Sequence, residues 1–327
     1  MALALTANER WLDVAQRCDH ATFFHTPHWQ RLAAEVFPSQ RDATVALELP
    51  GGATAILPMV EMRRLGAREC VSTFTGAYGG PISERPLDED AALRLQSELM
   101  DWRTAVKIVG NPLAAPLRAA PGMRAVEDYS LVLPLDGSFA AIERRFTKGH
   151  RSAMTKATRS GVSVRIGETV EDYRAYFELY RGSLERWGAG ASSAYPWELF
   201  AAGQRLAREL PDRMRLWLAL HDSAVVAGAW VFYWNRHAIW WHGAADPQAL
   251  ELRPNNLLIP AIAEAALEAG YELFDMGATG GHEGPARFKR HFGAEPRPLR
   301  HLEYQPPLLG AARAALARGR ALRGRSR

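Results

Sequence analysis

The chain has 327 residues, of which 47% are hydrophobic, so it is long enough for two ordinary domains and unlike a globally disordered protein. The formal charge is +4, but residues 311–327 hold six arginines and no acidic residue, and the remaining 34 basic and 36 acidic side chains leave the body slightly acidic. This distribution argues against a basic surface spread over the whole molecule of the kind that nucleic-acid-binding proteins use.

Cysteine content and the N-terminus indicate the compartment. Cys18 and Cys70 cannot form a disulfide framework and lack metal-ligand spacing, which is typical of a reducing compartment. The first fifteen residues include acidic side chains and no long apolar run, so we expect no signal peptide. No apolar stretch approaches the roughly 20 residues of a membrane helix, and we therefore predict a cytoplasmic protein.

Residues 1–128 follow the pattern of a unit that mixes helices and strands. Two β-rich runs flank Pro50-Gly51-Gly52, a glycine turn that predicts a hairpin. The glycine-rich run 76–81 lacks the Lys-Ser/Thr pair of a P-loop, and we interpret it as a tight loop near a cleft. In chain order we predict helices at 7–18 and 30–37, strands at 43–49, 53–61 and 71–75, a helix at 88–102 and a strand at 105–109.

A second unit of similar order begins near Tyr129. Its clearest element is an amphipathic helix at 171–187, whose aromatic stripe we assign to the core. Because both halves run through a hairpin to a strand, a helix and a strand, we predict a duplicated α/β unit with domains 1–128 and 129–306 and a basic tail, 307–327. Strands are predicted at 129–135, 162–166, 216–220, 225–234 and 238–244, with a basic helix after the first and a loop at 189–196 that could cover a cleft.

The most informative stretch is 252–293. An apolar, Ala-rich run from Leu257 to Ala269 predicts a helix that asparagines cap and Gly270 stops, with Pro260 in its first turn. A strand at 271–277, a glycine-rich loop and a basic aromatic motif are predicted to follow.

The strings RPNNLL, GYELFDMG and FKRHFGAEP in this stretch resemble the C-terminal half of the FemAB-like acyltransferases, also called BioF2-like, of the GNAT superfamily. The basic string RRFTKGHRSAMTKATRSGVSV upstream is similar to the same family, whereas the first 130 residues match only in outline. The resemblance implies an α/β (α+β) fold of two tandem GNAT-like units with mixed, largely antiparallel sheets.

The resemblance, together with the motifs that are missing, limits the possible reactions and donor co-substrates. The sequence has no GxSxG, HExxH, CxxC or Walker A motif, which disfavours hydrolases and metalloenzymes. GNAT enzymes hold the pyrophosphate of acetyl-CoA on a glycine-containing loop, but the equivalent segment, Leu252–Leu257, has no glycine, and Pro254 removes an N–H donor. Two donor co-substrates therefore stay open, an aminoacyl-tRNA, as characterised FemAB-like enzymes use, or an acyl-CoA. No permanently bound cofactor or metal is expected.

Site residues are assigned by the same resemblance. Fem-type enzymes carry a Phe-Lys pair that matches Phe288-Lys289, and we hypothesise that Lys289 stabilises the tetrahedral oxyanion of acyl transfer. Candidate general bases are Glu283, His282 and Asp275, although Asp275 could equally cap a turn. Residues expected to bind the phosphate-bearing donor or the acceptor are Lys148, Arg151, Arg253, Asn255, Asn256, Arg287 and Arg290.

The predicted function is transfer of an acyl or aminoacyl group onto an amine, either a small molecule or a cell-envelope precursor. Two alternatives remain, an acyl-CoA-dependent N-acetyltransferase and a catalytically silent GNAT-like module that binds an anionic glycan precursor, lipid or RNA. The tail is compatible with a disordered segment or with a basic amphipathic helix that makes peripheral membrane contact.

Overall fold

A computed structural model describes residues 8–64, 67–73, 77–101, 103–187 and 194–307. The chain forms two compact units. The first unit takes in residues 1–20, 24–128 and 299–327, and the second unit takes in residues 21–23 and 129–298. Strands β8 (Arg124–Pro134) and β14 (Glu295–Tyr304) each begin in one unit and end in the other. The division into domains stays a prediction, and the basic tail beyond residue 307 lies outside the described residues.

The first unit contains a run of strands in the order β1-β4-β5-β7-β14, antiparallel except for the pair β5/β7. The chain passes through α3 between these two parallel strands, and β2, β3 and β6 form a separate small sheet. The elements are α1 (Asn8–Arg17), α2 (Pro27–Val36), β1 (Arg41–Asp42), β2 (Val45–Glu48), β3 (Thr54–Leu57), β4 (Val60–Arg64), β5 (Ala67–Val71), β6 (Ile82–Ser83), α3 (Glu89–Ser97) and β7 (Thr104–Ile108).

The second unit repeats this arrangement on a larger scale. Its strands follow the order β8-β13-β12-β11-β10-β9, with one parallel pair, β12/β13, and α8 lies between those two strands in the chain. The elements are α4 (Phe139–Arg144), α5 (Lys148–Arg159), β9 (Ser163–Gly167), α6 (Val170–Trp187), α7 (Trp197–Glu209), β10 (Met214–His221), β11 (Ala224–Trp234), β12 (His237–Ala245), α8 (Pro254–Glu268), β13 (Leu273–Ala278) and α9 (Glu283–Arg290).

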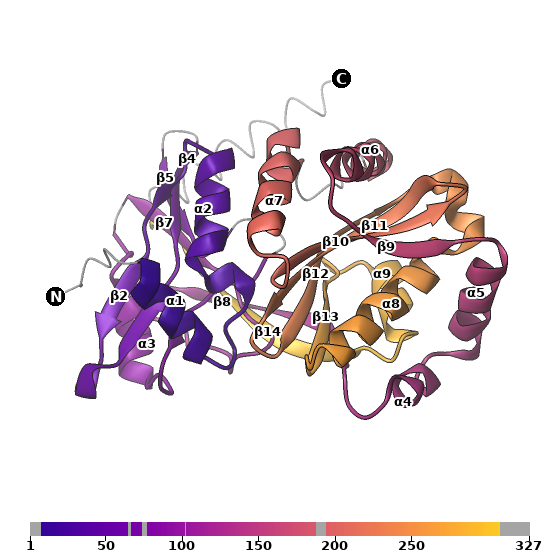
Figure 1. Ribbon diagram of the computed structural model, residues 1–327. Helices are drawn as coiled ribbons and strands as arrows, with labels where there is room; N and C mark the ends of the chain where they lie inside the picture. The colour runs from indigo at the N-terminus through magenta and orange to yellow at the C-terminus, as the bar shows by residue number, and fades with distance from the viewer. Residues whose placement is uncertain (1–7, 65–66, 74–76, 102, 188–193, 308–327) are drawn as a thin grey trace, which may run out of the picture. The chain divides into compact units, whose positions relative to one another are not determined.

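Helices cover both faces of the second unit's sheet, with α6 and α7 on one face and α8 on the other (Figure 1). Successive side chains of a strand point to opposite faces of the sheet, so one strand contacts the helices on both faces. Val231 and Tyr233 of β11 join the cluster that contains Leu258 of α8, whereas Trp230 and Phe232 pack among aromatic rings. The sequence-based assignment of the aromatic stripe to the core is confirmed by the buried tyrosines of α6, Tyr173, Tyr176 and Tyr180.

Several predicted boundaries are wrong for local reasons. The run predicted as one strand at 53–61 is broken around Pro58 into β3 and β4, which belong to different sheets. The strand predicted at 71–75 is β5, Ala67–Val71, which ends where that strand was expected to begin. Helix α9 occupies part of the predicted glycine loop and motif, and the sequence did not reveal α7 or β14.

Helix α8 begins three residues earlier than expected. Arg253 adopts the left-handed conformation, φ 59° and ψ 41°, and turns the chain so that Pro254 is the first helical residue. Proline is favoured at that position because its missing N–H has no partner there in any case. Pro260 therefore lies inside the helix instead of in its first turn. The fold class is confirmed, with mixed and largely antiparallel sheets in both units. Within the described ranges no helix is long and apolar enough to cross a membrane.

Candidate active site

The parallel strands β12 and β13 separate at a defined point. Their pairing runs from His237 and Leu273 to Ile239 and Asp275 and stops there. Just beyond, β12 has a bulge that leaves Trp241 without a ladder partner on β11, and the pairing of β13 with β8 is irregular between Asp275 and Ala278. Bulges of this kind re-aim side chains and release main-chain groups from the ladder, which is why they occur beside functional sites.

Lys289 of α9 reaches this point. Its Nζ donates to Gly277 O at 2.8 Å and to Ala278 O at 3.3 Å, and it lies 5.8 Å from the centre of the Trp240 ring. Desolvation by the surrounding protein lowers the pKa of Lys289 to about 8, while the Asp275 carboxylate acts in the opposite direction. The amine of Lys289 is thus mostly protonated at neutral pH, and the resulting ammonium is held at the end of β13.

Gly277 makes this arrangement possible. Its φ of +80° lies in a region that favours glycine, and a Cβ there would lie 3.5 Å from Trp240 O and 3.8 Å from Lys289 Nζ. The neighbouring Asp275 is fully buried, and its Oδ1 accepts hydrogen bonds from Ser130 Oγ at 2.5 Å and from Gly277 N at 2.7 Å. These contacts favour the turn-capping interpretation of Asp275, and its role as a base stays a prediction.

The other residues of the basic aromatic motif lie around α9. Glu283, the first residue of the helix, is exposed and forms an ion pair with Arg290 at 3.0 Å. Arg290 also donates to Tyr129 Oη at 3.3 Å, whereas Arg287 is exposed. Phe288 is half-buried, with its ring centre 5.2 Å from those of Phe292 and His150. The ion pair engages the Glu283 carboxylate, and Phe288 anchors α9 next to α5.

Two elements that carry predicted phosphate-binding residues, α5 and α8, pack against each other. Lys156 Nζ lies 3.6 Å from Glu251 Oε2, just ahead of α8. Burial, with the charges of His291 and Arg253, lowers the pKa of His150 to about 4. Arg253 directly precedes α8, the helix that packs against α5. Lys148 and Arg253 are both exposed, so an anion could approach them from solvent.

Other members of the predicted set have structural partners. The Arg151 guanidinium donates to Phe146 O and to Arg144 O, so it stabilises the link between α4 and α5. Asn256 is buried, and its N–H donates to Arg253 O at 2.9 Å, while Asn255 is half-buried. The start of α8 thus has no glycine and lacks one N–H at Pro254.

Ion pairs reduce the free charge of the basic segment 144–165. Arg145 pairs with Asp136 and Arg165 with Asp172. Among the described residues, no carboxylate lies within ion-pair distance of the three exposed cations that remain, Arg144, Lys148 and Arg159. The cluster of basic residues noted in the sequence is therefore reduced to a basic patch of these three side chains. The part of the chain that the structure describes holds no group of three or more His, Cys, Asp or Glu suited to a metal.

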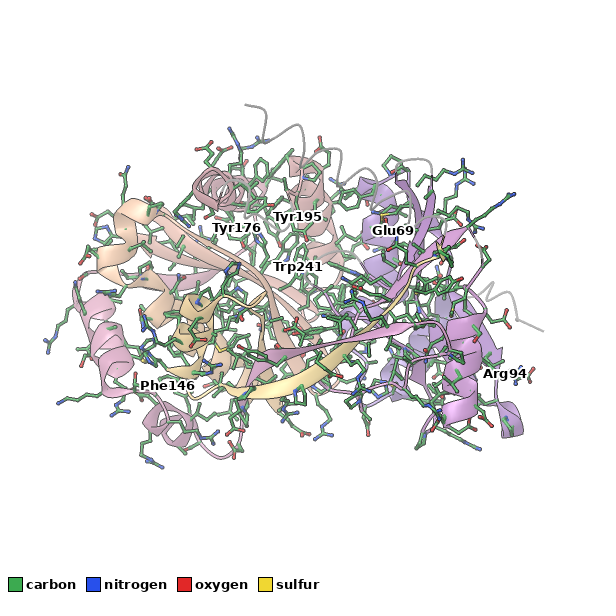
Figure 2. All side chains as sticks on the ribbon, turned by 180° about the vertical axis from the view of Figure 1, so that it is seen from behind. Glu69, Arg94, Phe146, Tyr176, Tyr195 and Trp241 are labelled. Atoms are coloured by element: carbon green, nitrogen blue, oxygen red, sulfur yellow. The ribbon has the colours of Figure 1, made fainter. Side chains whose placement is uncertain are left out.

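A polar pair that the sequence did not predict lies in the aromatic layer beside β12. Tyr176 Oη and His242 Nδ1 are 2.6 Å apart, and Trp240 Nε1 donates to His242 O at 2.9 Å. Figure 2 labels Tyr176, Tyr195 and Trp241, which gather in this part of the second unit. Desolvation lowers the pKa of His242 to about 3, so the imidazole is neutral. The only signal in the sequence was the bulky run of β12, which does not reveal that Tyr176 lies opposite.

Comparisons with known proteins agree with this geometry. Residues 144–290 match the model of the acetyltransferase (GNAT) domain. Among solved structures, FemX is similar over 92% of this chain and 96% of its own, with 11% identity and a TM-score of 0.67. The C-terminal domain of a putative lysylphosphatidylglycerol synthetase from Agrobacterium fabrum is similar over 91% and 92%, with 15% identity and a TM-score of 0.55.

A tandem GNAT protein from the clavulanic acid biosynthesis pathway is similar over 93% of this chain and 96% of its own, with 15% identity and a TM-score of 0.53. No curated protein sequence matches the chain. Residues 144–290 thus form a GNAT-type acetyltransferase domain, and the fold over most of the chain is similar to that of a tandem GNAT protein. The similarity to FemX agrees, at the level of the fold, with the FemAB-like resemblance noted in the sequence.

Proposed function

We propose that the protein transfers an acyl or aminoacyl group from an activated ester or thioester to an amine, with Lys289 stabilising the tetrahedral oxyanion. The observation that carries the proposal is the Lys289 ammonium, which is held by Gly277 O and Ala278 O where β12 and β13 stop pairing. A partly desolvated cation with a fixed position is suited to charge that develops on a reacting oxygen. The backbone carbonyls orient the ammonium without neutralising it.

In this mechanism the amine nitrogen attacks the donor carbonyl carbon, and the carbonyl oxygen gains negative charge beside Lys289. Collapse of the intermediate forms the amide and expels the donor alkoxide or thiolate. Two of the three candidate bases have other partners, because Asp275 binds Ser130 and Gly277, and Glu283 pairs with Arg290, while His282 is exposed at the start of α9. His242, with a pKa of about 3, is too weak a base at neutral pH. We infer that water or the leaving group removes this proton.

We propose an aminoacyl-tRNA as the donor. The start of α8 lacks the glycine loop that holds CoA pyrophosphate, and exposed Lys148 and Arg253 offer cations for RNA phosphates. The fold is that of FemX and of a lysylphosphatidylglycerol synthetase domain, which favours aminoacyl transfer and a cell-envelope amine as acceptor. A cytoplasmic location belongs to this proposal, because charged tRNA is made there and both cysteines are free.

An acyl-CoA donor is the second candidate. It is favoured by the match to an acetyltransferase domain and by the tandem GNAT neighbour, which was solved "without AcCoA". A small-molecule amine would then be the natural acceptor. The two donors differ in their dependence on the basic patch, since CoA carries far fewer phosphates than tRNA.

The test offers the purified protein labelled acyl-CoAs in one series and a mixture of charged tRNAs in another, each with candidate amines. Lys289→Ala should lower kcat by about 10²–10³-fold with the productive donor, the usual effect of losing one oxyanion donor. Lys289→Arg should retain more activity because it keeps the charge. Arg208→Ala, which removes an exposed cation of α7 from the same unit, is the control and should stay near wild type. Near-normal turnover by a folded Lys289→Ala protein would refute the role of Lys289.

A further inference from the structure

The first unit contains a cavity of about 380 Å³ that the proposed acyl transfer does not use. Its walls come from the end of α1 and the following residues, from the glycine-rich loop noted in the sequence, and from the segment after β7. The lining residues that matter here are Cys18, His20, Gly79, Pro81, Asn111 and Arg85. The interpretation of the glycine-rich run as a loop near a cleft therefore agrees with its described part.

A thiol and an imidazole lie together in this cavity. Cys18 Sγ is 3.5 Å from His20 Nδ1 and 3.4 Å from Nε2. His20 Nε2 also lies 3.1 Å from Pro81 O, which can only accept, so Nε2 carries a hydrogen and donates it. Nδ1 is then the nitrogen that can take the thiol proton.

The surrounding backbone holds this pair in place and favours its charged form. Asn111 is buried, and its Nδ2 donates to His20 O at 2.8 Å, which fixes the backbone of His20. Cys18 Sγ accepts hydrogen bonds from the backbone N–H groups of Ser83 and His20. Donors aimed at sulfur stabilise a thiolate and have no comparable effect on a thiol.

The pKa values of the two groups shift in the directions that an ion pair requires. Burial raises the pKa of Cys18, but its hydrogen bond and charge interaction with His20 and the two backbone donors outweigh burial, so the pKa is lowered. Burial lowers the pKa of His20, but the hydrogen bond and charge of Cys18, with Pro81 O and Asp19, raise it overall. The other charged groups that line the cavity are Arg17, Glu84, Arg85 and Arg300.

From this geometry we infer that Cys18 is a nucleophilic thiolate that exchanges with low-molecular-weight disulfides admitted by the cavity. The thiolate attacks one sulfur of R–S–S–R, a protein–S–S–R bond forms, and R–S⁻ leaves, while the original thiol proton stays on His20. The incoming disulfide is the oxidant, so electrons balance. The residue is 3% exposed, so reagents reach it through the cavity and not from the outer surface.

Arg85 indicates the charge of the preferred disulfide. It is exposed at the cavity, and no carboxylate of the described residues lies within ion-pair distance of its guanidinium. Arg17 and Arg300, in contrast, are paired with acidic side chains. The site should therefore favour a disulfide that bears carboxylates over one that bears amines.

Cys70 provides an internal control. It lies on β5 and is 1% exposed, and burial raises its pKa to about 11. Both Cys18 and Cys70 are free thiols in the same chain. Their environments differ in the imidazole, the two backbone donors and the cavity, so a difference in reactivity reports on these features.

The experiment is stopped-flow reaction of the full-length protein with dithiobis-nitrobenzoate near pH 6.5, where an ordinary thiol is mostly protonated. We expect one fast equivalent in the wild type and in Cys70→Ser, and none in Cys18→Ser. His20→Gln should slow the reaction at least about tenfold, because Gln cannot take the proton. The proposal is overturned if the native protein shows no fast thiol, if Cys70 is the fast one, or if folded His20→Gln reacts at the wild-type rate.

Two further measurements keep the test decisive if His20→Gln fails to fold. In Cys70→Ser, the pH dependence of iodoacetamide alkylation should have its midpoint below that of a free cysteine, and an ordinary or raised midpoint overturns the proposal. Relative to its rate with free cysteine, the dicarboxylate dithiodipropionate should react faster than the diamine cystamine, since both are dialkyl disulfides that differ in charge, and Arg85→Ala should reduce that ratio. Equal relative rates for the two disulfides would overturn the preference for anions.

Discussion

Two effects of opposite sign act on the ammonium of Lys289. Desolvation favours the neutral amine and lowers the pKa to about 8, and the Asp275 carboxylate favours the cation. The unfolded chain, in which Lys289 has an ordinary pKa, binds more protons between pH 8 and 10.5. This shift therefore lowers stability below pH 8, and that cost disappears as the pH rises toward 10.5. Retaining a desolvated ammonium despite this cost is expected of a functional group.

The same shift predicts a pH dependence of turnover. If the protonated form of Lys289 stabilises the oxyanion, kcat should fall as the pH rises through about 8, provided that the acceptor is saturating. In Lys289→Arg the guanidinium stays charged throughout this range, so the residual activity should lack this basic limb. The profile is measured from pH 6 to 10 for both proteins. If both the wild type and Lys289→Arg lost activity near pH 8, the basic limb would belong to the acceptor or to another residue.

Lys289 and Phe288 were identifiable from a sequence motif, but their surroundings were not. Gly277 O accepts from a lysine twelve positions along the chain, and Ser130 reaches Asp275 across 145 positions. Local patterns carry no information on such contacts, because the strand register that creates them is set by packing. For the same reason, Tyr176 and His242 could not have been paired from the sequence.

At the scale of elements, close packing decides at which helix positions only glycine fits. On α7, a Cβ at Gly203 would lie 2.2 Å from the fully buried ring of Trp230. On α6, a Cβ at Gly182 would meet no atom within 4 Å. The two positions carry the same residue in the same type of element, but only one of them touches a rigid neighbour.

These glycines predict opposite effects of one substitution. Gly203→Ala should lower the free energy of unfolding by about 1–3 kcal/mol, the usual cost of overpacking a core. Gly182→Ala should raise it by about 0.5–1 kcal/mol, because alanine is the better helix former and nothing obstructs it. Urea unfolding of both variants beside the wild type provides the comparison. Equal effects of the two substitutions would show that the contact between α7 and Trp230 is not as tight as described.

Elements with strong local periodicity or clear turns were predicted well. Helices α1 and α6 and the hairpin β10/β11 match their predicted ranges closely, because amphipathic spacing and turn residues are local signals. The start of α8 was misplaced because it depends on Arg253 in a left-handed conformation that asparagine or glycine more often adopts. Glycines around Glu283 concealed α9, whose position depends on packing of its Phe288 against Phe292.

At the scale of the whole molecule, ion pairs decide which basic side chains remain available to bind an anion. The basic segment 144–165 loses part of its charge to ion pairs, and Arg144, Lys148 and Arg159 remain exposed and without carboxylate partners among the described residues. Arg253 adds a cation directly before α8, the helix that packs against α5. This basic patch, and not the net charge of the chain, is the feature that separates the two donor hypotheses.

The prediction is that replacing Arg144, Lys148 and Arg159 together by Gln weakens use of a tRNA donor and reduces the salt dependence of its binding. Each lost phosphate contact should lower the slope of log K against log salt by about 0.7. The control replaces Arg41, Arg63 and Arg94, exposed cations of the first unit, with the same change of charge. Filter binding and transfer assays over a range of salt follow both variants. If the patch variant behaves like the control with tRNA, the patch does not bind RNA.

The sequence by itself determined the class of fold, the identity of most helices and hairpins and the Phe-Lys motif that holds Lys289, since each was identified from residues close together in the chain. Tertiary structure alone decided where β12 and β13 separate, which carbonyls hold Lys289, which cations of the basic segment stay unpaired and which distant segments enclose Cys18 and His20 in a cavity. These features arise from strand register, bulges and packing between distant segments, which depend on the whole set of contacts and leave no periodic trace in the sequence.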